Sequence, residues 1–274
     1  MHLTAIIPCV NYADYLQLTL PAATRFADKV LVVTSLADRV TPDIAADHGV
    51  DCVATDEWYK NGSVFNKGAA LNRAIAVAAP KDWILLMDAD ILLMPPPDNW
   101  HVLHKKMMYG VRRRDIGNPE QWQRCLDGCW YDMPYIPLPP IKRTPKGLKV
   151  WAYRKSGNPI AMQGYFQLWH WRTNPHTLKE HHTAAVYDSE LAERWPDHLR
   201  HFVPWTNYSV MHMGQARVNW EGRTTEHWAV TPPDLEAIEV ASAAWHADPI
   251  PPPPIKHMPL TIRAAVEGQT WHYR

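Results

Sequence analysis

Short apolar runs without regular polar alternation recur through the first part of the chain, and they constrain its fold more than any other feature. They lie at residues 3–8, 29–34, 51–55 and 83–87. Continuous apolar runs of this length are typical of strands that are buried on both faces of a parallel sheet. The residues between them, 12–26, 38–48 and 66–79, carry apolar side chains at helical spacing. This alternation predicts a Rossmann-like α/β fold in which a mostly parallel central sheet has helices on both faces.

The distribution of proline divides the chain into regions of different composition. Only four of the 25 prolines precede residue 95, and clustered prolines exclude long helices and central strands. Beyond that point we expect short helices at 98–110, 188–195 and 233–246, and strands at 161–171 and 208–212. The chain is thus expected to be one domain in three parts: the α/β residues 1–95, an irregular Pro- and Trp-rich region at 96–230, and a C-terminal helix, Pro-rich strap and tail at 231–274.

Length and composition exclude several classes of protein. The 274 residues are 46% hydrophobic and 20% charged, which is typical of a globular chain with an ample core. No apolar run reaches the roughly 20 residues of a membrane-spanning helix, and the first residues lack the pattern of a secretory signal. Because the four cysteines (Cys9, Cys52, Cys125 and Cys129) are scattered, we expect free thiols and a cytoplasmic protein.

Two aspartates follow the fourth apolar run, in the sequence Asp88-Ala89-Asp90. Carboxylates that leave a buried parallel strand lie at the carboxyl edge of the sheet, where open α/β sheets bind ligands. Short oxygen ligands suit Mg²⁺ or Mn²⁺, with a substrate diphosphate completing the shell. The alternative is a solvated turn with two ordinary acids, but charges inside the apolar stretch WILLMDADILLM favour a function.

Several segments, in this order, resemble the family 2-like group of GT-A glycosyltransferases. The resemblance covers residues 3–95 and 161–223, through LTAIIPCVNYADYL, VLVVTS, FNKGAALNRAI, LLMDAD, GYFQLWH, YDSELAER and VMHMGQARVNWEGR. It implies a GT-A fold with a nucleotide-sugar-binding half at 1–95 and an acceptor-binding half at 96–230. It also implies transfer of a sugar from a nucleotide-sugar, with a UDP-sugar as the expected donor, to an acceptor hydroxyl.

The resemblance also implies a metal site. Asp90 would be a direct metal ligand, Asp88 a ribose or second metal contact, and His212 a further metal ligand, with Ala89 beside the nucleotide-sugar. The alternative for His212, which stands in an apolar stretch, is a core histidine bonded to the backbone. Imidazole is a better ligand for Mn²⁺ than for Mg²⁺, so Mn²⁺ is the expected cofactor.

Further contacts with the nucleotide-sugar are expected where strands end and helices begin. They are Pro8, Asn11, Tyr12, Ser35, Asp38, Lys67, Arg217 and Arg223. Ser35 and Asp38 could instead serve only as turn and cap residues. Lys67 could be solvated, and the two arginines could form surface ion pairs.

Inverting transfer, which the resemblance favours, needs a carboxylate base to take the proton of the acceptor hydroxyl. In the segment 187–194, Asp188 falls on the position that the family uses, and Glu190 is the next candidate. The tyrosine that precedes Asp188 replaces an acid of the family pattern. The alternative for Asp188 is an ordinary helix cap, and retention of configuration stays open.

The acceptor side is marked by charge and aromatic residues. Residues 104–155 hold 12 Lys and Arg, among them Arg112, Arg113 and Arg114, against four acids, a net charge of +8 that the rest of the chain balances with −8. Basic residues interleaved with aromatic ones are typical of nucleic-acid grooves. One fitting acceptor is a hydroxylated or hydroxymethylated base in DNA, as for viral DNA-modifying transferases, which would place the protein in a host cytoplasm.

Other interpretations of this side stay open. Gln163, Gln167 and Trp169 could line the acceptor pocket or belong to a buried core strand. The basic segment could be a solvated face, or could bind an acidic glycan or a lipid phosphate. A non-catalytic carbohydrate- or nucleic-acid-binding protein on a transferase scaffold is the alternative of another class. A nucleotidyltransferase would need a Gly-rich phosphate loop, where this chain has PCVNYADY.

Overall fold

The computed structural model describes residues 1–95, 102–116, 119–126, 164–184, 187–204, 208–213 and 222–223. The helix expected at 233–246 and the strap and tail after it lie outside the described residues. So do Gln163 and Arg217.

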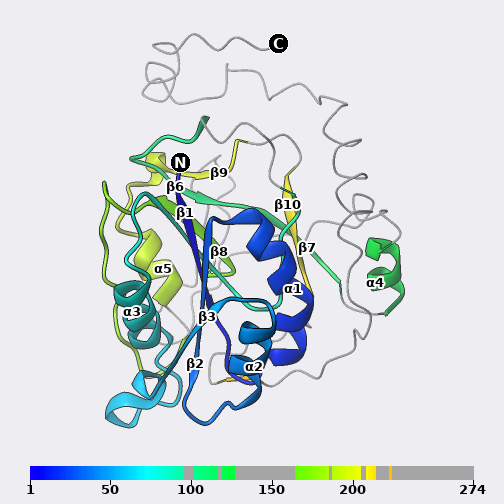
Figure 1. Cartoon of the computed structure of the whole chain (residues 1–274). Coiled ribbons are helices and arrows are strands. Elements are labelled where there is room, and N and C mark those ends of the chain that lie inside the picture. The colour runs from blue at the N-terminus through cyan, green and yellow to red at the C-terminus, as the bar shows by residue number, and fades with distance from the viewer. Residues whose placement is uncertain are drawn as a thin grey trace, which may run out of the picture.

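The central sheet has seven strands in the order β3-β2-β1-β4-β8-β6-β9 (Figure 1). They are β1 (Leu3–Pro8), β2 (Lys29–Ser35), β3 (Asp51–Thr55), β4 (Trp83–Met87), β6 (Met108–Gly110), β8 (Phe166–His170) and β9 (Arg200–Phe202). Among these strands β8 alone runs opposite to its neighbours, because it pairs antiparallel with both β4 and β6 while the other pairs are parallel. The predicted α/β class with a mostly parallel sheet is confirmed.

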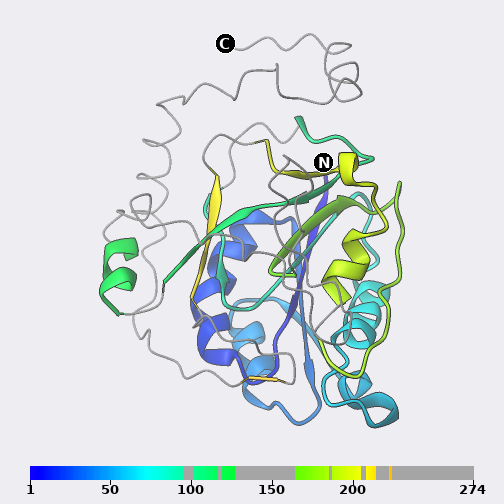
Figure 2. The same ribbon diagram turned by 180° about the vertical axis from the view of Figure 1, so that it is seen from behind.

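Helices cover both faces of this sheet, as expected (Figures 1 and 2). One face carries α1 (Ala13–Phe26) and α2 (Val40–Asp47), and the other carries α3 (Lys67–Ala78) and α5 (Tyr187–Ala192). The shorter elements are η1 (Glu57–Gly62), α4 (Pro119–Leu126) and η4 (Asp197–Leu199).

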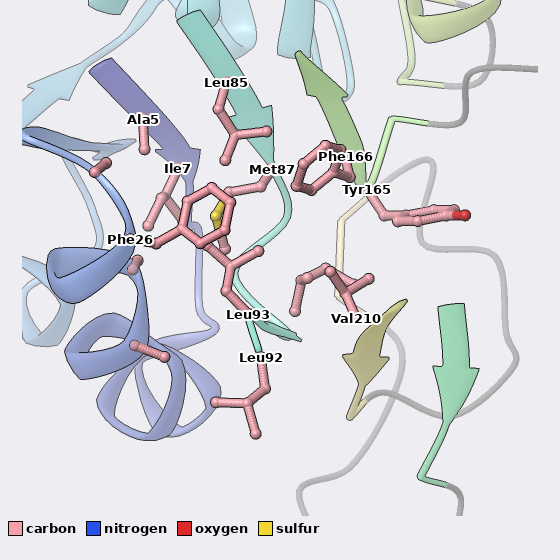
Figure 3. Close-up of a cluster of buried hydrophobic side chains, with 14 of the residues drawn as sticks. Ala5, Ile7, Phe26, Leu85, Met87, Leu92, Leu93, Tyr165, Phe166 and Val210 are labelled. Atoms are coloured by element: carbon pink, nitrogen blue, oxygen red, sulfur yellow. The ribbon is translucent and has the colours of Figure 1, made fainter. Parts of the chain in front are cut away.

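Strand alternation explains why the apolar runs are continuous. On β1, Ala5 and Ile7 pack in the core under α1, whereas Ile6 between them packs in the core under α3. Figure 3 shows the first of these cores, to which Phe26 of α1, Met87 of β4 and Phe166 of β8 all belong. Both faces are buried, so neither tolerates the polar alternation of a half-exposed sheet.

A second sheet of three strands begins directly after the paired aspartates. Its order is β5 (Ile91–Leu92), β10 (Ser209–His212), β7 (Arg112–Asp115). The register pairs Ile91 with His212 and His212 with Asp115. Three distant segments thus meet at the carboxyl end of β4.

The prediction of a helix at 98–110 is wrong for the residues of this range that the structure describes, because Met108–Gly110 form strand β6. Met108 packs under α3 and Tyr109 under α1, and only a strand directs consecutive side chains to opposite faces. The strand expected at 161–171 is confirmed as the shorter β8, and that at 208–212 as β10. Of the helices in the described residues, none is long and apolar enough to span a bilayer.

Candidate functional site

The carboxyl end of β4 carries the two aspartates on a tight turn. The amide of Ile91 donates to the carbonyl of Asp88 at 3.3 Å, and the hydroxyl of Thr19 on α1 holds the carbonyl of Ala89 at 2.7 Å. This turn lets the two carboxylates face different partners. Asp88 pairs with Lys67, and Asp90 faces His212.

Asp90 and His212 lie together at the junction of the two sheets. Nε2 of His212 is 3.4 Å from Oδ2 of Asp90, and the two side chains are only 11% and 9% exposed. The other oxygen of Asp90, Oδ1, is buried and accepts no hydrogen bond from the part of the chain that the structure describes. An orphaned buried carboxylate oxygen beside an imidazole is a donor set that suits a divalent cation.

The charges of this pair stabilise each other. Burial alone would lower the pKa of His212, but the carboxylates of Asp90 and Asp115 raise it to about 9. Burial alone would raise the pKa of Asp90, but the imidazole of His212 holds it below the ordinary value. The carboxylate of Asp90 is therefore kept ionised, as a metal ligand must be.

Lys67 occupies the first turn of α3 and is almost fully buried. Asn66 caps this helix by accepting from the amide of Ala69 at 3.1 Å. The ammonium of Lys67 pairs with Asp88 and lies 4.8 Å from the centre of the Tyr187 ring. Burial opposes its charge, but the carboxylate of Asp88 raises the pKa of Lys67 above its usual value, so this cation is not simply solvated.

The expected three-residue metal set is not assembled. Among the described residues, no three His, Cys, Asp or Glu side chains converge to hold a metal ion. The carboxylate of Asp88, expected as a ribose or second metal contact, pairs with Lys67. Asp90 and His212 remain together as candidate ligands.

Asp38 ties the loop after β1 to the start of α2. Its carboxylate accepts from the amide of Asn11 at 2.8 Å and from the hydroxyls of Thr34 and Thr41 at 3.0 and 2.7 Å. Its other oxygen accepts from the amides of Val40 and Thr41. Burial would raise the pKa of Asp38, but these hydrogen bonds lower it. Asp38 therefore makes the hydrogen bonds expected of a turn and cap residue. The hydroxyl of Ser35 supports the same turn by accepting from the amide of Asp38 at 3.2 Å.

Arg223 reaches the same loop from late in the sequence. It pairs with Asp14 through both terminal nitrogens, with Nη2 to Oδ2 at 2.7 Å, and donates to the carbonyl of Asn11 at 2.8 Å. Its guanidinium lies 4.9 Å from the ring centres of Tyr12 and Tyr15. Arg223 and Tyr12 thus contact each other, and Arg223 forms an ion pair with Asp14, which is the alternative left open for this arginine. Pro8 is the last residue of β1.

Asp188 lies at the start of α5 and is held by backbone donors. Its oxygens accept from the amides of Gly164 and Ser189, both at 2.8 Å. Burial raises the pKa of Asp188, and these two amides only partly oppose it. The negative charge of Glu190 is instead balanced by neighbouring side chains, because His181 lies 2.8 Å and Lys179 3.4 Å from its carboxylate.

The residues expected to contact the acceptor do not share one surface. Trp169 is fully buried, packs 5.9 Å from Trp195 and donates to the carbonyl of Asn174, so it belongs to the core under α5. Gln167 is also fully buried and donates to the carbonyl of Asp188 at 2.9 Å.

The three consecutive arginines of β7 alternate in direction. Arg112 is exposed beside the Phe202 ring, Arg113 lies over Tyr165, and Arg114 is buried with Nε 3.3 Å from the hydroxyl of Ser209. A strand places consecutive side chains on opposite faces, so these residues do not form one basic stripe.

Sequence reasoning missed two residues at the site. Asp115 contacts His212 at 2.9 Å, and Tyr187 lies against Lys67. The segment RRRD offers no apolar pattern, so only the pairing of β7 with β10 reveals Asp115. Tyr187 could have been found from its place beside Asp188.

No protein-family model matches the chain, and no curated protein matches it in sequence. Among solved structures, the mannosyltransferase PcManGT from Pyrobaculum calidifontis, in complex with GDP-Man and Mn²⁺, is 15% identical with a TM-score of 0.45, and the match covers 98% of this chain and 81% of that one. TarS 1–349 from S. aureus is 11% identical with a TM-score of 0.46, over 78% of this chain and 60% of that one. Mannosyl-3-phosphoglycerate synthase from Rubrobacter xylanophilus is 22% identical with a TM-score of 0.31; the match covers 44% of this chain and 41%, less than half, of that one.

Proposed function

We propose that the chain is a metal-dependent glycosyltransferase of the GT-A type, which moves a sugar from a nucleotide-sugar to an acceptor hydroxyl. The observation that carries this proposal is the pairing of Asp90 with His212 at the carboxyl end of the sheet, where Oδ1 of Asp90 is buried without a partner among the described residues. The segments that resemble such transferases, and that follow one another in the same order along the chain, support the same function.

Asp90 and His212 are the residues that would hold the metal, and this mixed oxygen and nitrogen set favours Mn²⁺ over Mg²⁺. The cation, when bound, supplies positive charge for the diphosphate of the donor. The ammonium of Lys67 lies beside Asp88 and supplies a second positive charge, while Asp88 contacts the ribose. The loop that Asp38 fixes, with Asn11 and Tyr12, borders the nucleoside, for which UDP is the proposed carrier.

Asp188 is the proposed base of an inverting transfer. The acceptor oxygen attacks the anomeric carbon, the bond from that carbon to the diphosphate oxygen breaks, and Asp188 takes the proton of the hydroxyl. The raised pKa of this carboxylate, caused by its burial, makes it a stronger base than an exposed aspartate. Glu190 is less suited, because its charge is already shared by His181 and Lys179.

A polyanion is the proposed acceptor, and a hydroxylated base in DNA is its leading form. The supporting observation is the charge of +8 over residues 104–155 in a chain of zero net charge. Binding to duplex DNA should weaken steeply as salt rises. Salt-independent or absent binding at low ionic strength would favour a glycan or lipid-phosphate acceptor instead.

A thermal-shift screen of nucleotide-sugars, with and without Mn²⁺, tests the proposed function. A true donor raises the midpoint of unfolding by mass action, and the rise should need the metal. Asp90→Ala and His212→Ala should each lose the metal-dependent part, whereas Asp47→Ala, at an exposed carboxylate of α2, should keep it. Equal metal-dependent shifts in all four proteins would refute the proposed site, and binding without sugar transfer or donor hydrolysis would favour a non-catalytic protein.

A further inference from the structure

Asp115 is the last residue of β7 and lies in register with His212 of β10. Its Oδ1 is 2.9 Å from Nδ1 of His212. The amide of Ile116 donates to the carbonyl of His212 at 2.8 Å, so the backbone fixes the two side chains next to each other. The contact is a product of strand pairing and not of two flexible surface side chains.

The same imidazole faces Asp90 through its other nitrogen, Nε2. When a metal ion displaces the proton of Nε2, Nδ1 keeps its hydrogen for the carboxylate of Asp115, so the lone pair that binds the metal is on Nε2. The imidazole thus lies between two carboxylates, with Asp115 at the end of β7 on one side and Asp90, just before β5, on the other.

Asp115 is itself held from a second side. Nε of Arg113 lies 3.6 Å from the same oxygen of Asp115, and the Arg113 guanidinium lies 5.0 Å from the centre of the Tyr165 ring. The side chain of Asp115 is only 21% exposed. A carboxylate fixed in this way limits how far the imidazole ring can turn.

We infer that Asp115 is a positioning residue, which holds the tautomer and ring orientation of His212 that metal binding needs. This inference rests on the proposed function. Carboxylates that accept from the second nitrogen of a ligating histidine are a general means of raising ligand basicity and fixing ring orientation. The residue touches neither donor nor acceptor in this proposal and acts only through His212.

Titration of the full chain with Mn²⁺ in the presence of UDP, followed by the electron paramagnetic resonance signal of free Mn²⁺, tests the inference. Asp115→Ala should weaken Mn²⁺ affinity about 10- to 100-fold. Asp115→Asn, which keeps an acceptor oxygen of the same shape, should weaken it less. Asp82→Asn serves as control, because Asp82 lies just before β4, at the opposite end of that strand from Asp88, and should leave the affinity unchanged.

A second readout separates positioning from a merely structural role. Electron spin echo envelope modulation detects coupling of bound Mn²⁺ to an imidazole nitrogen. This coupling should be present in the unaltered protein, absent in His212→Ala and weakened in Asp115→Ala. If Asp115→Ala does not fold, the isosteric Asp115→Asn carries the test on both readouts. Unaltered affinity and coupling in the folded Asp115 variants would overturn the inference, while unaltered affinity in Asp90→Ala and His212→Ala would overturn the proposed metal site itself.

Discussion

Nε2 of His212 and Oδ2 of Asp90 lie 3.4 Å apart although the two residues are on segments far apart in the chain. The antiparallel pairing of β5 with β10 brings them together, because His212 is opposite Ile91 and the amide of Met213 donates to the carbonyl of Asp90 at 2.8 Å. Two residues of strand after the paired aspartates are enough to fix this geometry.

Lys67→Met should destabilise the protein, because it leaves the carboxylate of Asp88 without its cation. We expect a loss of about 1–3 kcal/mol in the free energy of unfolding, less than for a fully buried pair, since the Asp88 side chain is 35% exposed. Urea unfolding measures the loss, and Lys67→Met combined with Asp88→Asn should recover part of it. The surface pair of Lys60 with Glu57 supplies the control, since Lys60→Met should leave stability unchanged. Equal losses in both lysine variants would contradict the role of burial.

Asp38→Asn should lower stability at neutral pH by about 1–2 kcal/mol, because the amide cannot accept all the hydrogen bonds of the carboxylate. Hydrogen bonds from Asn11, Thr34 and Thr41 outweigh burial and hold the pKa of Asp38 below its ordinary value of 3.8. The stabilisation is therefore present above pH 3.8 and is lost as the pH falls through the lower pKa of the folded state.

Urea unfolding from pH 7 to pH 3 should show the gap between the unaltered protein and Asp38→Asn closing at the acid end. Asp43→Asn, at an exposed position of α2, should show no such gap. A gap that stays constant with pH would mean that Asp38 does not titrate as described.

Gly68→Ala should destabilise the protein although alanine favours helices by about 1 kcal/mol. A Cβ at Gly68 would lie 2.1 Å from the carbonyl oxygen of Lys179. That segment cannot move freely, because Asn72 exchanges two hydrogen bonds with the backbone of Leu178. We expect a net loss of about 2 kcal/mol or more, measured by urea unfolding, and no loss for Arg73→Ala on the exposed side of α3. Unchanged stability of the Gly68 variant would show that the segment is not packed on α3.

Asp188→Asn should lower turnover by about 100- to 10,000-fold while nucleotide-sugar binding is retained. The amide keeps the shape of the carboxylate but cannot take the proton of the acceptor hydroxyl. Turnover and donor binding, measured on the same protein samples, separate the two effects. Glu190→Gln should have a much smaller effect on turnover; a larger one would transfer the role of base to Glu190.

The sequence predicts the first four strands and the three helices between them, because continuous apolar runs and helical spacing are local signals. It cannot predict β5 and β7, since one has two residues and the other reads RRRD. These strands form through their pairing with β10. The sequence alone therefore gives no sign that Asp115 lies beside His212. The pairing of Lys67 with Asp88 likewise depends on where a loop and a helix meet in space.

Trp169 illustrates a different limit of sequence reasoning. An aromatic residue in a strand of mixed polarity fits both a sugar pocket and a core, and the choice depends on which face the helices cover. Here α5 covers that face and Trp195 packs against Trp169. The core alternative, which the sequence left open, is the one that the structure supports for this residue.

Because β8 runs opposite to its neighbours, the carboxyl edge of the sheet holds the start of one strand beside the ends of the others. A purely parallel sheet offers only the ends of strands at its carboxyl edge, whereas β8 begins there, with Phe166 opposite Met87 of β4. The amide of Gly164, just before β8, thereby becomes available to hold Asp188 at 2.8 Å. One inverted strand thus supplies a backbone donor at an edge where its parallel neighbours contribute side chains.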